Sequence, residues 1–322
     1  MRLEDWREWP AERLAPEFER QARRWREELG WDARPLFDLV ESARAAGQLP
    51  GLVAVDVRGG IAGWCYANLQ DGLLFIGALH GQRADVVRVM LDEILAGPEA
   101  AFARGYRCFV FPDTPAVAAA LSRRRFDLEP FLYLSRPLPG RAGSGLPWAS
   151  RGWSLEDLPE TARLFARAYA GTTESRCFAP GARLDEWAAY VVQLGRTPAC
   201  GEWHPAASLA CPAEDPADGL RAALIATRLS AETSHVAQIA VDPAWRRRGV
   251  ASALVDASAA LAGAAGARSQ TLLVAGSNEH ARRMYSRLGF TQSAAFLFAD
   301  RARISRGTTG TIPARDPAQA TA

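Results

Sequence analysis

The residues of this sequence best suited to chemistry form a basic, glycine-containing turn between a strand-like and a helix-like segment. Arg246, Arg247 and Arg248 precede Gly249 and Ala251, after an apolar run at residues 236–240. Such a turn directs unpaired backbone N–H groups, at the positive end of a helix dipole, toward one point. That arrangement binds phosphate, and the arginines add positive charge. Neither G-x-x-x-x-G-K-[ST] nor G-x-G-x-x-G matches, so the two common nucleotide-binding loops are excluded.

A second strand-to-helix unit follows at residues 271–290. Residues 271–274 are apolar and predict a buried strand. Asn278, Ala281 and Tyr285 then recur at helical spacing and share one helix face. Gly289 suits a helix C-cap, and Phe290 returns the chain to the core.

Together these two segments resemble the GNAT family of N-acetyltransferases. Arg246-x-x-Gly249-x-Ala251 matches that family's [QR]-x-x-G-x-[GA] signature, and residues 278–290 match N-x-x-A-x-x-x-Y-x-x-x-G-F. The resemblance covers roughly residues 150–300. It implies an α/β (α+β) fold with a mixed, mostly antiparallel central sheet flanked by helices. It also implies acetyl-CoA as the acyl donor. No metal site is expected, because His204 and His280 lack metal-ligand spacing.

The same resemblance implies where acetyl-CoA binds. The strand before the turn is expected to splay from its neighbour, so that its backbone pairs with the pantetheine arm and polarises the acyl carbonyl. The expected cofactor-binding residues are Ile239, Ala240, Val241, Arg246, Arg247, Arg248, Gly249, Val250, Ala251, Ser252, Asn278 and Tyr285.

Acyl transfer also needs an acid for the leaving thiolate and a base for the amine. Tyr285 is the candidate acid, because a phenol with an ordinary pKa near about 10 can protonate the CoA sulfur. His235 is the candidate base, since strand alternation places it with Ala237, Ile239 and Val241 on one face. Glu232, three residues earlier, is the competing base.

The first half of the chain repeats the same order of predicted elements. A helical segment at residues 1–50 precedes a hairpin at 52–66, a strand at 73–78, a helix at 84–103 and a strand at 106–111. The segment at 81–87 lacks the Gly-x-Ala turn, and Asp85 stands where a phosphate would bind. Leu121 and Thr114 occupy the positions of Tyr285 and Asn278. This copy is therefore expected to be degenerate and to shape the structure or the substrate site.

These patterns predict two tandem GNAT folds. Residues 1–138 form the degenerate domain, 139–150 the linker, 151–302 the catalytic domain and 303–322 a disordered tail. The layout is similar to that of the mycothiol synthases. The acceptor segment at 169–187 and the residues after it carry the polar side chains of Thr172, Thr173, Glu174, Arg176, Asp185, Glu186, Glu202 and Trp203, which are compatible with a cationic amine or with an ordinary surface.

Composition limits the possible partners. The 322 residues carry a net charge of +2, which favours neither nucleic acid nor a membrane surface. Five scattered cysteines without a C-x-x-C pair, and no apolar signal or membrane-spanning segment, predict a cytoplasmic protein. The predicted function is an acetyl-CoA-dependent N-acetyltransferase acting on a small-molecule or peptide amine, as a monomer or homodimer. A longer acyl-CoA donor and a non-catalytic CoA-binding module are the alternatives.

Overall fold

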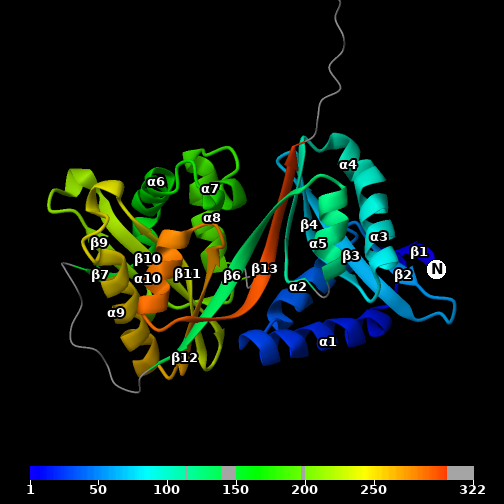
Figure 1. The fold of residues 1–322 in the computed structure, drawn as a ribbon, viewed down its shortest axis with the longest axis horizontal. Coiled ribbons are helices and arrows are strands. Elements are labelled where there is room, and N and C mark those ends of the chain that lie inside the picture. Colours follow the sequence, from blue (N-terminus) through cyan, green and yellow to red (C-terminus); the bar gives the residue numbers. More distant parts are fainter. Residues whose placement is uncertain (113–114, 139–149, 197–199, 303–322) are drawn as a thin grey trace, which may run out of the picture.

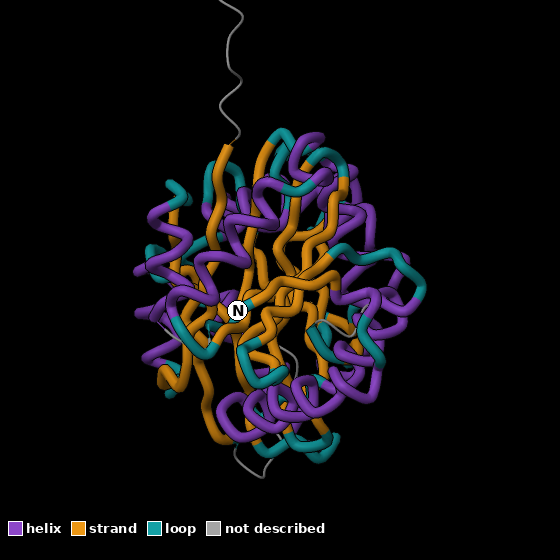
Figure 2. Tube along the Cα trace, turned by 90° about the vertical axis from the view of Figure 1, so that its right-hand side faces the viewer, coloured by secondary structure: helices purple, strands orange, loops and turns teal. Residues whose placement is uncertain are grey.

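A single 13-stranded mixed sheet runs through both halves of the protein in the computed structural model, which describes residues 1–112, 115–138, 150–196 and 200–302. The strand order is β1-β2-β3-β4-β5-β13-β6-β12-β11-β10-β9-β7, with β8 beside β10. Helices cover both faces of the sheet (Figures 1 and 2). Most neighbouring strands are antiparallel, and the described parallel pairs are β4·β5 and β11·β12. The predicted fold class is confirmed.

The first half contains the predicted elements and one additional strand. Its strands are β1 (Arg2–Asp5), β2 (Gly51–Val55), β3 (Ile61–Gln70), β4 (Leu73–Gly81), β5 (Gly105–Val110) and β6 (Asp127–Pro137). Its helices are α1 (Ala11–Leu29), α2 (Arg34–Ala45), α3 (Ala84–Ala96), α4 (Pro98–Phe102) and α5 (Pro115–Arg123). Strand β1 lies inside the segment predicted to be helical. Helices α1 and α2 pack on one face of the sheet, and α3 and α5 on the other.

The second half repeats this plan. Its strands are β7 (Arg151–Gly152), β8 (Glu202–Trp203), β9 (Leu209–Pro212), β10 (Leu220–Ser230), β11 (Thr233–Val241), β12 (Ser269–Ala275) and β13 (Thr291–Ala302). Its helices are α6 (Leu158–Ala168), α7 (Thr173–Phe178), α8 (Leu184–Arg196), α9 (Val250–Ala264) and α10 (Glu279–Arg287). Ser154 and Asp157 form a capping box at the 3₁₀ turn before α6.

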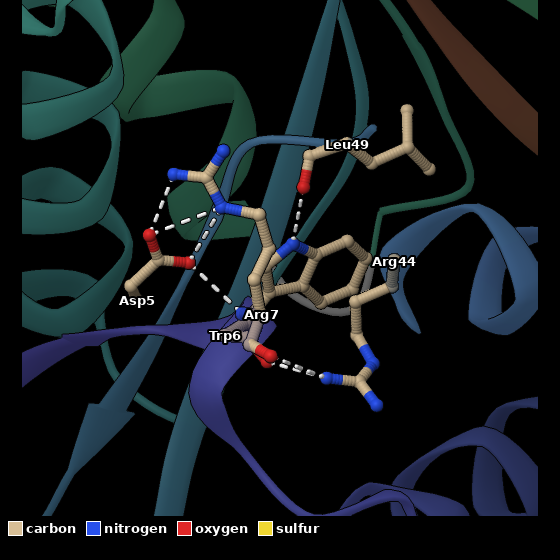
Figure 3. A network of polar contacts seen from close by, with 5 residues as sticks. All are labelled: Asp5, Trp6, Arg7, Arg44 and Leu49. Carbon is tan, nitrogen blue, oxygen red and sulfur yellow. Dashed lines mark hydrogen bonds and ion pairs between the residues drawn. The ribbon is translucent and has the colours of Figure 1, made fainter. Parts of the chain in front are cut away.

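A short network fixes the 3₁₀ turn that follows β1 (Trp6–Glu8) to α2 (Figure 3). The Arg44 guanidinium donates hydrogen bonds to the carbonyls of Trp6 and Trp9 at 2.8 and 2.9 Å. The fully buried Trp6 donates from Nε1 to the Leu49 carbonyl at 2.7 Å. Because Arg44 satisfies buried carbonyls and pairs with Glu41, its charge is accommodated in the interior.

The last strands of the two halves are exchanged. Strand β6 of the first half pairs with β12, and β13 of the second half pairs with β5. The two exchanged strands also pair with each other in the middle of the molecule (Figure 1). Each half therefore completes the sheet of the other, and the cluster around Phe131, Tyr133, Phe296 and Phe298 joins them. The predicted linker and tail at 139–149 and 303–322 lie outside the described residues.

Both halves contain the same irregularity at corresponding strands. Strand β11 pairs with β12 only from Thr233 to Val236, and β4 pairs with β5 only from Leu73 to Ile76. Immediately afterwards a β-bulge leaves Ala237 unpaired opposite β10 and Gly77 unpaired opposite β3. The shared position of splay and bulge supports the internal repeat read from the sequence. No helix among the described residues could span a membrane.

Candidate active site

The basic turn forms a backbone cradle at the start of α9. Gly249 adopts a left-handed conformation, with φ +82°, that glycine tolerates and other residues resist. No side chain caps the helix that begins at Val250. The N–H groups of its first turn, which have no partner within the helix, are thus available to an anion.

The three arginines of this turn have different positions. Arg246 donates to the Ala168 carbonyl at 2.6 Å, which ties the turn to the end of α6. Arg247 lines the adjoining cleft. Arg248 instead lies over the ring of Trp245, which also contacts the Arg221 guanidinium. This position does not support the prediction that Arg248 contacts the cofactor. Trp245 packs between the guanidinium groups of Arg221 and Arg248.

A cleft of about 910 Å³ extends from this turn to Tyr285. Ile239, Ala240 and Val241 line it on one side, and Val250, Ala251 and Ser252 line it at the helix start. Sequence reasoning missed three further basic residues on its wall, which come from α10: His280, Arg283 and Arg287. Their helical spacing was the available signal, because positions three, four and seven apart share a face.

The splay of β11 opens one edge of that strand to the cleft. Beyond Val236 the strand pairs only with β10 on its other side. The Tyr169 hydroxyl, 2.6 Å from the Ile239 carbonyl and 2.8 Å from the Gln238 side-chain oxygen, closes part of this edge. The expected splayed strand is present, and its free backbone suits pairing with an extended ligand.

Tyr285 lies at the inner end of the cleft, beside Asn278 and Glu174. Asn278 caps α10 by accepting from the Ala281 N–H at 3.1 Å, and it donates to the Glu174 carboxylate at 3.2 Å. Tyr285 is buried, and burial raises the pKa of its hydroxyl above the ordinary value. A tyrosine in this setting holds its proton at neutral pH, as an acid must before it donates.

Of the two predicted bases, His235 lines a cavity that adjoins Tyr285, whereas Glu232 lines neither that cavity nor the cleft. His235 is buried, its Nδ1 lies in hydrogen-bond contact with the Thr271 hydroxyl at 2.9 Å, and burial lowers its pKa to about 3. The bulge at Ala237 breaks the strand alternation, so that Val236 rather than His235 packs on the Ile239 side. Glu232 is exposed in the β10–β11 turn, 3.5 Å from Arg268. Neither residue is suited to be the base.

A second cavity, of about 420 Å³, begins where the cleft ends; we call it the inner chamber. The cleft and the inner chamber share the residues Tyr169, Glu174, Ile239, Asn278, Ala281 and Tyr285. The first half supplies part of its wall through Trp25, Tyr66, Phe109 and Phe111. The predicted substrate-shaping role of the first half therefore has a structural counterpart.

The predicted acceptor segment is only partly at the site. Thr172, Thr173 and Glu174 line the cleft, and Glu174 also reaches the inner chamber. The other residues of this segment have partners away from the site. Arg176 pairs with Asp300 and Asp185 with Arg183, and Glu186 accepts a hydrogen bond from the Gly181 N–H. Trp203 packs against Trp153, and Glu202 is exposed in β8.

The corresponding turn of the first half is too short to cradle phosphate. Strand β4 ends at Gly81 and α3 begins at Ala84, whereas β11 ends at Val241 and α9 begins at Val250. Asp85 places a carboxylate in the first turn of α3, and a hydrogen bond from Arg83 lowers its pKa. Leu121 is buried in α5, and Thr114 lies outside the described residues. These features oppose CoA binding there.

Comparison with known proteins identifies the second half. Residues 153–290 match the family model of the acetyltransferase (GNAT) family. No curated protein matches the chain.

Solved structures resemble most of the chain in fold. A GCN5-related N-acetyltransferase from Sphaerobacter thermophilus has TM-score 0.60 at 14% identity over 82% of this chain and 84% of that one. A glucosamine N-acetyltransferase region of a fungal multi-domain GH3 beta-N-acetylglucosaminidase has TM-score 0.60 at 13% identity, over 93% and 38%. A tandem GNAT protein from the clavulanic acid biosynthesis pathway has TM-score 0.52 at 11% identity, over 79% and 82%. Residues 153–290 thus match the acetyltransferase (GNAT) family, and the chain has the fold of GNAT proteins, a tandem GNAT protein among them.

Proposed function

We propose that the second half transfers an acetyl group from acetyl-CoA to a primary amine, directly and within a ternary complex. The observation that carries this proposal is the meeting of two cavities at Tyr285. One leads from a free helix N-terminus beside Arg247, and the other leads into the protein between its two halves. Two substrates that enter from opposite sides would meet at this residue.

The residues of the cleft fit acyl-CoA. The N-terminus of α9 and Arg247 bind the pyrophosphate, Arg283 and Arg287 add positive charge, and the free edge of β11 holds the pantetheine arm. Bound acyl-CoA supplies the activated thioester. Backbone N–H groups near Ile239 stabilise negative charge on the acyl oxygen.

The proton transfers assign roles to two side chains. The amine nitrogen forms the new C–N bond while the C–S bond breaks. Before this step the Glu174 carboxylate takes one proton from the bound ammonium, which leaves a neutral amine. Tyr285 donates its proton to the departing sulfur and takes up the second proton, which the nitrogen loses as the amide forms. Glu174 replaces His235 and Glu232 as the base, because it is the carboxylate at the junction of the two cavities.

Tyr285→Phe tests the proposal. We expect kcat for amine-dependent release of CoA thiol to fall by about 10²–10⁴-fold, the usual contribution of a positioned acid. The affinity for CoA, measured by calorimetry, should be retained because the ring remains. Tyr106→Phe removes a hydroxyl from the core of the first half and is the matched control.

Three results would contradict parts of this assignment. Activity of Tyr285→Phe close to the wild-type value would remove Tyr285 as the acid and reopen a catalytic role for the first half. CoA binding without thiol release, for every amine in a broad panel, would favour a non-catalytic CoA-binding module. No binding of CoA would show that the turn at Gly249 is not a phosphate cradle.

A further inference from the structure

The walls of the inner chamber are dominated by aromatic rings. Phe109 and Phe296 stack with ring centroids 5.7 Å apart, and Trp25 and Phe111 meet Phe296 edge-on or tilted at 5.6 and 5.2 Å. Among the lining residues of the second half, Phe178 stacks on Tyr190 at 4.7 Å. Rings from both halves of the chain therefore enclose one space.

Several polar side chains on the same walls already have partners, whereas the buried indole N–H groups of Trp25 and Trp31 have none among the described residues. The amide of Gln238 donates to the Tyr190 hydroxyl at 2.8 Å, and its oxygen lies 2.8 Å from the Tyr169 hydroxyl. The His235 ring is bonded to Thr271 and, with its low pKa, is neutral. Among the described residues that line the chamber, Glu174 alone belongs to an acidic or strongly basic type.

We propose that the inner chamber selects an acceptor with one primary amine on an apolar, aromatic body, an arylalkylamine in chemical class. This inference rests on the proposed function. The ammonium pairs with Glu174 at the junction, beside Tyr285, and the aromatic body lies among the rings. Aromatic faces favour both a planar apolar body and the nearby cation.

The same walls disfavour other amines. An amino sugar would bury several hydroxyl groups on these walls. The indole N–H groups of Trp25 and Trp31 could each donate to one of them, and every further unpaired hydroxyl carries a desolvation cost. A diamine would place its second ammonium in the aromatic part of the chamber, away from Glu174. The chamber, about 420 Å³, has a volume within the range of small-molecule sites.

An acyl chain is the competing occupant of this space. Glu174 argues against it, because a carboxylate at the mouth of the chamber gains nothing from an apolar chain and is desolvated by it. An ammonium at the same position offsets that desolvation. The chamber is therefore assigned to the acceptor rather than to the donor.

The first test compares amines with acetyl-CoA fixed. We expect kcat/KM for 2-phenylethylamine or tryptamine to exceed that for glucosamine and putrescine by at least about 100-fold. Comparable values for the polar amines would overturn the acceptor class while leaving the acetyltransferase function standing. Thiol release with none of the amines would instead contradict the proposed function.

Two variants with matched controls test the residues. Phe109→Leu should raise KM for the arylalkylamine at least about tenfold and leave KM for acetyl-CoA unchanged. Phe102→Leu, the same change at an exposed ring of the first half, should alter neither. Glu174→Gln should raise KM for the amine and lower kcat, whereas Asp185→Asn, an exposed carboxylate of the same segment, should not.

Binding without chemistry gives an independent readout. 2-Phenylethylamine added to the CoA-bound protein should change the fluorescence of Trp25 and Trp31, and Phe109→Leu should weaken that response. A saturable response that Phe109→Leu leaves unchanged would place the amine elsewhere. A preference of at least about tenfold for phenylacetyl-CoA over acetyl-CoA, with a small amine such as methylamine, would assign the chamber to the acyl group and overturn the proposal.

Discussion

The buried imidazole of His235 connects residue-scale packing with the pH dependence of stability. Its pKa is lowered to about 3 in the folded protein and returns to about 6.5 on unfolding. Between these values the unfolded state binds one more proton, so the free energy of unfolding falls as pH falls. This single group contributes about 1.4 kcal/mol per pH unit below pH 6.5.

His235→Asn should remove that contribution while its amide keeps a hydrogen bond to Thr271. Urea unfolding between pH 5 and 7.5 should show a shallower loss of stability on acidification than in the wild-type protein. Burial also lowers the pKa of His204, to about 4. Its contribution to the pH dependence of stability is the same in the variant and the wild type, so it cancels when the two slopes are compared. His280→Gln, at an exposed position, is the control. Equal slopes for His235→Asn and the wild type would mean that His235 protonates freely in the folded protein.

At this scale the sequence could predict the residues that belong to short linear patterns. Gly249 and Asn278 stand where their spacing indicated, because local backbone geometry alone determines the turn and the cap. Glu174 could not be ranked above neighbouring acids, since only the fold brings it to Asn278. His235 was assigned to the wrong side of its strand because the bulge at Ala237 changes the alternation without an evident sequence signal.

At the scale of elements, the junction of β11 and α9 depends on one backbone conformation. In Gly249→Ala the added Cβ would have no described atom within 4 Å. The loss of folding free energy, about 1–2 kcal/mol, therefore arises from the positive φ alone. We expect CoA affinity, measured by calorimetry, to fall at least about tenfold, because relief of that strain turns the N–H groups away from the phosphate. The change in melting temperature reports the cost to stability.

Gly266→Ala provides the matched control for this element. Gly266 follows the other end of α9, also has a positive φ, and also has no atom near an added Cβ. Its replacement should lower stability comparably and leave CoA affinity unchanged. Equal affinity for CoA in both variants would show that the turn at Gly249 does not hold the phosphate.

Most elements follow from local periodicity, and the exceptions have physical causes. The buried strands β4, β5 and β12 are apolar runs, and this pattern alone is enough to predict them as strands. Strand β1 escaped prediction because its residues, Arg2–Asp5, are mostly polar and become a strand only by pairing with β2. Helix α7 is six residues long, too short to show a period.

At the scale of the whole molecule, the exchange of β6 and β13 was not predictable. Each strand has an apolar sequence that suits either half, and the choice depends on pairings between residues more than a hundred positions apart. Each domain predicted from the sequence, at 1–138 and 151–302, is one continuous stretch of chain. In the sheet, by contrast, the last strand of each stretch pairs with strands of the other. The halves also share the aromatic core around Phe131 and Phe296 and the wall of the inner chamber.

Cleavage of the chain between β6 and β7 tests this interdependence. A protease site inserted within residues 139–149 would separate the chain into two fragments without cutting a described strand. We expect the fragments to co-elute in native buffer and to unfold in one cooperative transition, because β6 remains between β12 and β13. After separation in urea, the second fragment alone should aggregate on refolding, since β12 and β13 would expose unpaired edges. Mixing the fragments during refolding should restore solubility and CoA binding. Fragments that part in native buffer, or two separate unfolding transitions, would show that the halves are independent domains despite the shared sheet.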